Sequence, residues 1–297
     1  MSQPTETDTM ANNIKRYGPW AIVTGASQGI GEGFARELAG RGYHLVLVSR
    51  RAEKLADLAR ALEHEHGIQT RVVGADLSVP GTAESILEAV ADLDVGLVIS
   101  NAGAARMGGF LQNRVEDLAA DLHLNALSHM ELAHAFGSQL RSRGRSGGLL
   151  LVSSTAALQP VALGANYSGA KAFVYNLGES LHREFAEIDV DVTVLLPGPT
   201  NTKGLNERTD VAMGKLPMPA MSVQTLVREG LTALQRRKSA HVAGAMNRWS
   251  ARLMPRRFMA WMLGTVLRRN TAPHLLPSAP IALSPSPGMR PVDTHAA

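Results

Sequence analysis

Residues 20–31, WAIVTGASQGIG, contain the pattern that decides the fold. The stretch begins with a short apolar and β-branched run, WAIVT, and a glycine-rich segment, GASQGIG, follows directly. Residues 32–40 then have the composition of a helix. Glycines in a turn between a strand and a helix let the backbone approach a pyrophosphate at the helix N-terminus. The stretch therefore predicts a dinucleotide site in an α/β fold.

The end of the next apolar run indicates which dinucleotide the site binds. Residues 45–48, LVLV, have the pattern of a second strand, and Arg50 follows shortly after. In NAD enzymes an acidic residue about 20 positions beyond the glycine loop binds the ribose 2′-hydroxyl. Arg50 lies nineteen residues after Gly31, and the first acidic residue beyond the strand is Glu53. An arginine here favours a 2′-phosphate and so NADP(H); the alternative is a solvated charge at a helix start.

A tyrosine and a lysine on one predicted helix form a second candidate feature. Residues 165–187 have a helical composition, and Tyr167 and Lys171 are four positions apart, so both can point into one site. A phenol has a pKa near ~10, which a neighbouring ammonium lowers toward the range of a general acid. Ser154 follows the apolar run 149–152, where a buried strand would face the ligand crevice. The Tyr-x-x-x-Lys spacing alone also occurs by chance in many helices.

Five motifs in order resemble the short-chain dehydrogenase/reductase family over roughly residues 18–245. They are the TGxxxGxG loop, Asp76-Leu77, Asn101-Ala102-Gly103, the Ser–Tyr–Lys set and the segment Pro197-Gly198-Pro199-Thr200-Asn201-Thr202. Ser100 and Thr200 stand where the family has Asn and Val. The resemblance implies a single Rossmann-type α/β domain, a doubly wound parallel sheet of about seven strands with helices on both faces. Within the family, the chain most resembles the branch of 3-oxoacyl reductases and 17β-hydroxysteroid dehydrogenase type 12.

The resemblance also assigns the cofactor contacts. The implied NADP(H)-binding residues come from the glycine loop, the second- and third-strand ends, the Asn-Ala-Gly motif, the Tyr–Lys pair and the proline-rich loop. They are Gly25, Ser27, Gln28, Gly29, Ile30, Gly31, Arg50, Asp76, Leu77, Asn101, Ala102, Gly103, Tyr167, Lys171, Pro197, Gly198, Thr200 and Thr202.

The same resemblance implies reduction of a carbonyl to an alcohol. Tyr167 would protonate the developing alkoxide, and Ser154 would hydrogen-bond the same oxygen. Lys171 would lower the Tyr167 pKa and hold the ribose hydroxyls. Asn125, in a helix expected over residues 114–140, would complete the proton relay through a water. The alternative is a non-catalytic NADP(H)-binding regulatory or scaffold protein. A homodimer or homotetramer is expected.

Composition narrows the class of protein. The 297 residues are 45% hydrophobic and 19% charged, ordinary values for a soluble enzyme, and include no cysteine. A net charge of +4 does not favour nucleic-acid binding. Residues 1–18 lack the apolar core of a secretory signal, and no apolar run approaches the ~18 residues that span a bilayer. We expect a cytoplasmic protein. The histidines do not share a ligand face, and no metal site is predicted.

The chain beyond the sixth predicted strand departs from compact family members. Residues 203–221 are rich in Met, Leu and Pro, at the position of a substrate lid. Seven of the twelve methionines fall in residues 213–262. Methionine adapts to irregular apolar shapes, which suits a hydrophobic substrate, although it suits ordinary packing nearly as well.

Residues 246–270 are predicted to form a basic amphipathic helical extension that Pro255 divides in two. It could cover the substrate cleft, contact a second subunit or lie on a membrane surface. We rank the first two ahead, because each half is short. Residues 1–18 and the Pro/Ala/Ser-rich residues 271–297 are predicted to be disordered tails, which leaves 19–245 as the catalytic domain.

Overall fold

The computed structural model describes residues 16–202 and 220–277, and its centre is one sheet of seven parallel strands. The strand order is β3-β2-β1-β4-β5-β6-β7. The strands are β1 (Trp20–Thr24), β2 (His44–Ser49), β3 (Thr70–Gly74), β4 (Val95–Ser100), β5 (Gly147–Val152), β6 (Val190–Leu196) and β7 (Ala240–Val242). The order reverses between β1 and β4, which is where ligands bind in open α/β sheets. The predicted doubly wound fold is confirmed.

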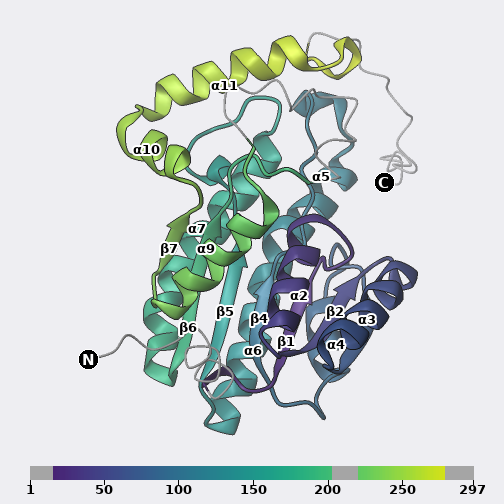
Figure 1. The fold of residues 1–297 in the computed structure, drawn as a ribbon. Coiled ribbons are helices and arrows are strands. Elements are labelled where there is room, and N and C mark those ends of the chain that lie inside the picture. Colours follow the sequence, from purple (N-terminus) through teal and green to yellow (C-terminus); the bar gives the residue numbers. More distant parts are fainter. Residues whose placement is uncertain (1–15, 203–219, 278–297) are drawn as a thin grey trace, which may run out of the picture.

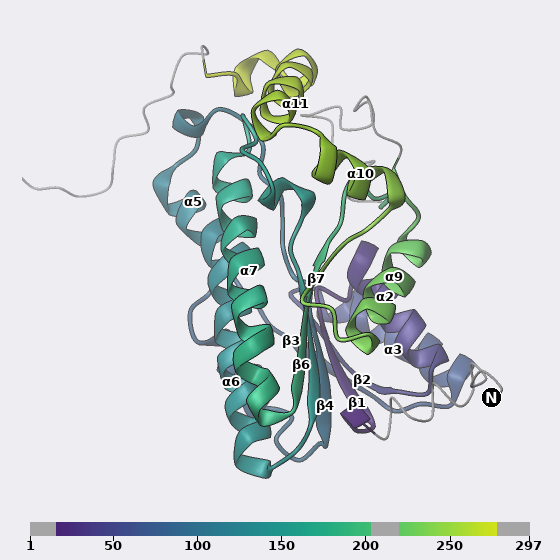
Figure 2. The same cartoon turned by 90° about the vertical axis from the view of Figure 1, so that its left-hand side faces the viewer.

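Two layers of helices cover the sheet (Figures 1 and 2). On one face lie α2 (Gly29–Gly40), α3 (Ala52–His66) and α9 (Val223–Gln235), and on the other α4 (Thr82–Glu88), α6 (Ser128–Arg143) and α7 (Ala165–Glu184). The strands alternate between the two cores: in β1, Val23 packs toward the first layer and Ile22 toward the second. Both faces of each central strand are therefore apolar, as parallel sheets require.

The helix expected over residues 114–140 is interrupted. The structure has α5 (Val115–Leu122), a π-helical turn at His123–Leu127 and then α6, which continues to Arg143. A single π turn inside an α-helix is often found at a functional site. This turn contains Asn125, so the irregularity lies where the catalytic asparagine is predicted.

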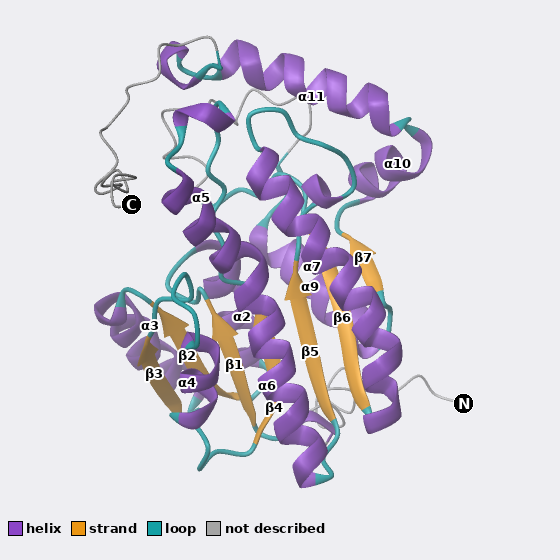
Figure 3. Cartoon of the chain, turned by 180° about the vertical axis from the view of Figure 1, so that it is seen from behind, coloured by secondary structure: helices purple, strands orange, loops and turns teal. Residues whose placement is uncertain are grey.

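Two short α-helices follow β7. They are α10 (Ala245–Leu253) and α11 (Arg256–Asn270), and Pro255 separates them as predicted. Figures 1 and 3 show α11 lying across the end of the molecule toward which the strands point. No helix within the two described ranges is long and apolar enough to cross a membrane.

The structure describes a part of each predicted tail. Tyr17 is 3% exposed, and its hydroxyl donates to Asp191 Oδ2 at 2.8 Å, so this residue of the predicted tail packs against the sheet. At the other end, a 3-10 turn at Pro273–Leu275 packs near the loop before α5, where Gly109 N donates to Leu275 O at 2.6 Å. Residues 1–15 and 278–297, and most of the expected lid at 203–219, lie outside the described residues.

Candidate active site

A cavity of about 870 Å³ lies at the carboxyl ends of the strands. It is lined by all the predicted cofactor residues except Gly31: Gly25, Ser27, Gln28, Gly29, Ile30, Arg50, Asp76, Leu77, Asn101, Ala102, Gly103, Tyr167, Lys171, Pro197, Gly198, Thr200 and Thr202. Ser154 lines the same cavity. The fold thus brings together segments that are far apart in the sequence.

The glycine loop is held by the turn after β4. Thr24 Oγ1 accepts hydrogen bonds from the backbone N–H groups of Asn101 (2.9 Å) and Ala102 (3.0 Å), and Asn101 Nδ2 donates to Thr24 O at 2.8 Å. Gly31 is buried under this loop, where a Cβ would overlap the carbonyl oxygen of Gly25. Gly31 therefore lets α2 pack closely against the loop and does not line the cavity, and its predicted cofactor contact stays a prediction. The bare glycine backbone at the N-terminus of α2 fits a pyrophosphate.

Two arginines, not one, lie at the end of β2. Arg50 has an exposed side chain, and its Nη1 lies 3.9 Å from Asp76 Oδ2. Arg51 Nη2 donates to Ser27 Oγ at 3.2 Å, across the glycine loop. Burial raises the pKa of Asp76, but hydrogen bonds from Ser78 and the charge of Arg50 outweigh it and hold that pKa below its usual value. Arg51 also lines the cavity and was missed from the sequence, although it adjoins Arg50.

Ser154 and Lys171 are anchored at the end of β5. Ser154 Oγ accepts from Ala156 N at 3.1 Å, and Lys171 Nζ donates to Val152 O at 3.0 Å. Ser153 Oγ donates to Lys171 O at 2.7 Å, which ties α7 to the strand. Lys171 is 3% exposed, and burial lowers its pKa to about 7. Tyr167, one turn earlier on α7, also faces the cavity.

Asn125 lies beside the cavity without lining it. Its amide is held by backbone: Oδ1 accepts from Ala104 N at 3.1 Å, and Nδ2 donates to Ala104 O and Asp121 O, both at 2.8 Å. It lines a much smaller void that Tyr167 also borders. Asn125 thus fixes the loop that follows the Asn-Ala-Gly motif, and its predicted catalytic role stays a prediction.

His129 is buried beside Lys171, and sequence reasoning missed this histidine as a member of the site. His129 Nε2 lies 3.5 Å from Lys171 Nζ, and its Nδ1 lies 2.7 Å from Ser100 Oγ. Burial first, and the nearby ammonium second, lower the His129 pKa well below its usual value, so the ring is neutral. One signal was available, because His129 follows Asn125 by four residues. The Ser at position 100 is thus connected to the site through this ring.

The proline-rich loop after β6 is packed under α10. Thr200 Oγ1 donates to Gly198 O at 3.0 Å, and Thr200 pairs with Met221 in an isolated bridge. A Cβ on Gly198 would overlap the side-chain amide of Asn247, a buried residue of α10 that also lines the cavity. The C-terminal extension is therefore part of the site. Sequence reasoning missed Asn247 because it lies outside the five motifs, in a segment with no local signal for this contact.

The remaining wall of the cavity is mainly apolar. It is formed by Met107, Leu158, Val161, Met254, Met259, Leu263 and Leu267, with Arg256 as a charged member. Four of these apolar side chains and Arg256 come from residues 254–267. The C-terminal helices cover the cavity, as the lid interpretation predicts.

Comparison with known proteins places these features in context. A family model described as short chain dehydrogenase matches residues 19–211. A 7beta-hydroxysteroid dehydrogenase of Clostridium sardiniense is 32% identical over 239 residues, 80% of this chain and 90% of that protein. A very-long-chain 3-oxoacyl-CoA reductase of Podospora anserina is 35% identical over 192 residues, 62% of this chain and 56% of that protein. A solved short-chain dehydrogenase from Sphingobium yanoikuyae in complex with NADPH has a TM-score of 0.71 and 31% identity, covering 78% of this chain and 91% of that one.

Proposed function

This chain belongs to the short-chain dehydrogenase/reductase family, and we propose from that premise that it is an NADPH-dependent reductase of bulky apolar ketones. The observation that carries the proposal is a single cavity with two kinds of wall. Ser154, Tyr167 and Lys171 share it with the glycine loop on one side and with the methionines and leucines of the C-terminal helices on the other. A nicotinamide cofactor and an apolar carbonyl compound can therefore meet at these three side chains.

The chain's own residues supply proton transfer and orientation. When bound, the nicotinamide cofactor supplies the hydride. Tyr167 donates its phenolic proton to the carbonyl oxygen as that oxygen gains negative charge, and Ser154 Oγ hydrogen-bonds the same oxygen. The Lys171 ammonium stabilises the phenolate left behind. Asn125 holds the backbone around the π turn, beside the void that Tyr167 borders, where a proton path from solvent can pass.

The preference for NADPH is supported by the charge at the end of β2. Arg50 and Arg51 both line the cavity, and the carboxylate nearby, Asp76, lies at the end of β3 beside Arg50. Guanidinium groups bind phosphate with geometric specificity, whereas the ribose 2′-hydroxyl of NAD is matched by a carboxylate after β2. The similar Sphingobium yanoikuyae structure is a complex with NADPH.

The substrate class is supported by the apolar wall and by the names of the relatives. A rigid steroid-sized ketone or a long 3-oxoacyl chain would bury against Met254, Met259 and Leu263. The relatives include a 7beta-hydroxysteroid dehydrogenase and a very-long-chain 3-oxoacyl-CoA reductase. Arg256 adds a positive charge to this wall, which favours a substrate that also carries an acidic group.

The test is NADPH oxidation with a panel of neutral ketosteroids, carboxylated ketosteroids, 3-oxoacyl thioesters and small aldehydes. We expect turnover with one of the bulky classes and little with the aldehydes. Tyr167→Phe should reduce kcat at least ~10²-fold, because only the transferable proton is lost. Its NADPH affinity, followed by cofactor fluorescence, should stay within a few-fold of the unmutated protein.

Two results would contradict the proposal. Turnover that survives Tyr167→Phe within a few-fold would exclude the tyrosine as the acid. Tight NADPH binding without turnover on any member of the panel would instead favour the alternative of a regulatory or scaffold protein.

A further inference from the structure

The outer face of the two C-terminal helices exposes large apolar side chains. We define this outer face by Met246, Trp249, Leu253, Phe258 and Trp261, whose exposed fractions run from 44% to 67%. Trp249 and Leu253 are four apart on α10, and the rings of Phe258 and Trp261 lie 6.0 Å apart on α11. None of these five lines the cavity, which is reached by other positions of the same helices.

The outer face is also unusually basic. The sequence contains no Asp or Glu between Glu229 and Asp293. Besides Arg256, which lines the cavity, four exposed arginines on α10 and α11 have no ion pair or side-chain hydrogen bond with any residue in the described ranges: Arg252, Arg257, Arg268 and Arg269. Elsewhere some exposed arginines are paired with carboxylates, as Arg60 is with Asp57 and Arg145 with Asp94, whereas Arg141, Arg183 and Arg236 have no such pair among the described residues. Within the described part of the chain, no carboxylate neutralises these four arginines of α10 and α11. Their positive charges are therefore available to a binding partner.

The apolar area extends beyond the two helices. Phe110 and Leu111 are 56% and 67% exposed and precede α5. The backbone hydrogen bond from Gly109 N to Leu275 O, at 2.6 Å, holds this loop beside the segment that follows α11. Figures 1 and 2 show α11 as the outermost element at that end of the molecule, with α5 beneath it. Seven large exposed side chains thus gather at one end, a larger area than either short helix offers alone.

We propose that this outer face docks on the surface of an anionic lipid bilayer. Tryptophan and phenylalanine side chains lie well at the level of lipid head groups, and arginines beside them meet the phosphates. A two-fold contact between copies of this chain fits less well. It would place the same arginines against one another with no carboxylate from residues 230–292 to neutralise them. An anionic surface satisfies both the aromatic and the basic residues.

The docking goes beyond the proposed reductase function and does not depend on it. The geometry gives it a consequence, however, because Met259 and Leu263 of α11 line the cavity while Phe258 and Trp261 lie on the outer face. The apolar wall of the cavity is then one helix away from the lipid, which is where an apolar substrate is concentrated.

The first experiment is co-sedimentation of the full chain with two vesicle types, pure phosphatidylcholine and an equal mixture of phosphatidylcholine and phosphatidylglycerol. We expect at least ~tenfold stronger binding to the anionic vesicles, and loss of that difference in molar salt, where the Debye length falls to about 3 Å. Trp249→Ser/Trp261→Ser and, separately, Arg257→Gln/Arg268→Gln should each weaken binding about tenfold or more.

Matched controls change the same chemistry elsewhere. Met130→Ser/Phe173→Ser removes two exposed apolar side chains on other helices, and Arg60→Gln/Arg114→Gln removes two exposed charges. Both controls should bind vesicles like the unmutated protein. The unfolding temperature of every variant shows whether it is folded, and its affinity for NADPH shows that a loss of vesicle binding is separate from the cofactor site.

A second measurement uses the tryptophans. Two of the three, Trp249 and Trp261, lie on the outer face, whereas Trp20 is 8% exposed in β1. Anionic vesicles should shift the emission to shorter wavelength, and Trp249→Phe/Trp261→Phe should abolish the shift. Equal binding to both vesicle types would overturn the proposal. So would an absence of vesicle binding together with a dimer, seen by analytical ultracentrifugation, that Trp249→Ser/Trp261→Ser converts to a monomer.

Discussion

At the scale of single residues, His129 is the buried side chain beside the ammonium of Lys171. Lys171 Nζ has a backbone acceptor, Val152 O, at 3.0 Å and the His129 ring nitrogen at 3.5 Å. Burial favours the neutral amine and lowers the Lys171 pKa to about 7. In the tautomer with its proton on Nδ1, the neutral imidazole can accept a hydrogen bond from Nζ at Nε2, and such a bond would favour the ammonium. Ser100, 2.7 Å from the other ring nitrogen, holds the ring in this orientation.

His129→Leu should therefore change the pH dependence of the reaction. In the proposed mechanism the ammonium is needed beside the Tyr167 phenolate, so we expect the rate of reduction to fall as pH rises through the Lys171 pKa. Loss of the imidazole acceptor lowers that pKa further, and the falling limb of kcat/KM should move about one unit toward lower pH. His129→Gln, which keeps an acceptor, should recover part of the shift, and His134→Leu, an exposed position on α6, should have none. A lower unfolding temperature with an unchanged pH profile would make His129 a packing residue only.

At the scale of elements, we propose that the turn from β2 into α3 determines the choice of cofactor. Its Arg50 is exposed and free to meet a phosphate except for a long contact with Asp76 at 3.9 Å. We expect NADPH to be preferred over NADH by roughly ten- to a hundredfold in kcat/KM, since a hydrogen bond to a charged group contributes about 1.5–3 kcal/mol. Arg50→Asp should reverse the preference. Arg60→Asp, an equal change of charge on α3 away from the cavity, should leave it unchanged. Equal kcat/KM values for the two cofactors in the unmutated protein would contradict the prediction.

The elements also show which parts of the site could be predicted from sequence. Two motifs follow directly after a predicted strand: the glycine loop and Asn101-Ala102-Gly103. Their position at the carboxyl ends of the strands, beside the cavity, can therefore be predicted from the sequence alone. Contacts between distant elements leave no such local pattern. His129 of α6 lies beside Lys171 of the neighbouring helix α7. Asn247 contacts Gly198 because α10 packs on the loop after β6. The sequence does not predict the π turn at His123–Leu127, because weak helix formers such as its His123 and Asn125 also occur inside regular α-helices.

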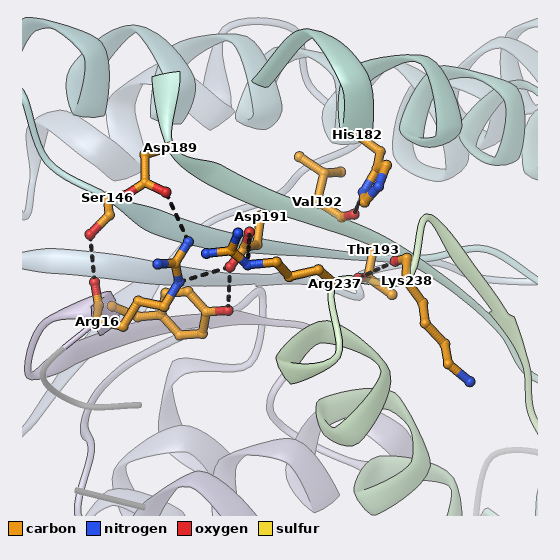
Figure 4. A network of polar contacts seen from close by, with 10 residues as sticks. Arg16, Ser146, His182, Asp189, Asp191, Val192, Thr193, Arg237 and Lys238 are labelled. Atoms are coloured by element: carbon orange, nitrogen blue, oxygen red, sulfur yellow. Dashed lines mark hydrogen bonds and ion pairs between the residues drawn. The ribbon is translucent and has the colours of Figure 1, made fainter. Parts of the chain in front are cut away.

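At the scale of the whole molecule, the N-terminal segment packs against the amino ends of the strands, and the cavity lies at their carboxyl ends. Asp191, near the start of β6, accepts from Arg16 Nε at 2.9 Å and from the Tyr17 hydroxyl at 2.8 Å, and Arg237 Nε lies 3.3 Å away (Figure 4). Burial and the Asp191 carboxylate raise the pKa of the Tyr17 phenol above its usual value, so it is a permanent donor. One carboxylate therefore joins the N-terminal segment, β6 and the end of α9.

Asp191→Asn should lower the free energy of unfolding without changing catalysis. The substitution removes the charge that three donors share and leaves the buried Tyr17 hydroxyl with a weaker acceptor, which we expect to cost about 2–3 kcal/mol. The neighbouring Asp189→Asn is a matched control. Asp189 is 63% exposed and holds only Arg16, so its replacement should cost less than about 1 kcal/mol, and asparagine suits its positive φ of 55°. Urea unfolding measures both free energies of unfolding. The kcat of the folded variants should match that of the unmutated protein, because the network lies at the amino ends of the strands and the cavity at their carboxyl ends. Equal destabilisation by the two substitutions would show that Asp191 is one more surface charge, and that burial of Tyr17 alone holds the N-terminal segment in place.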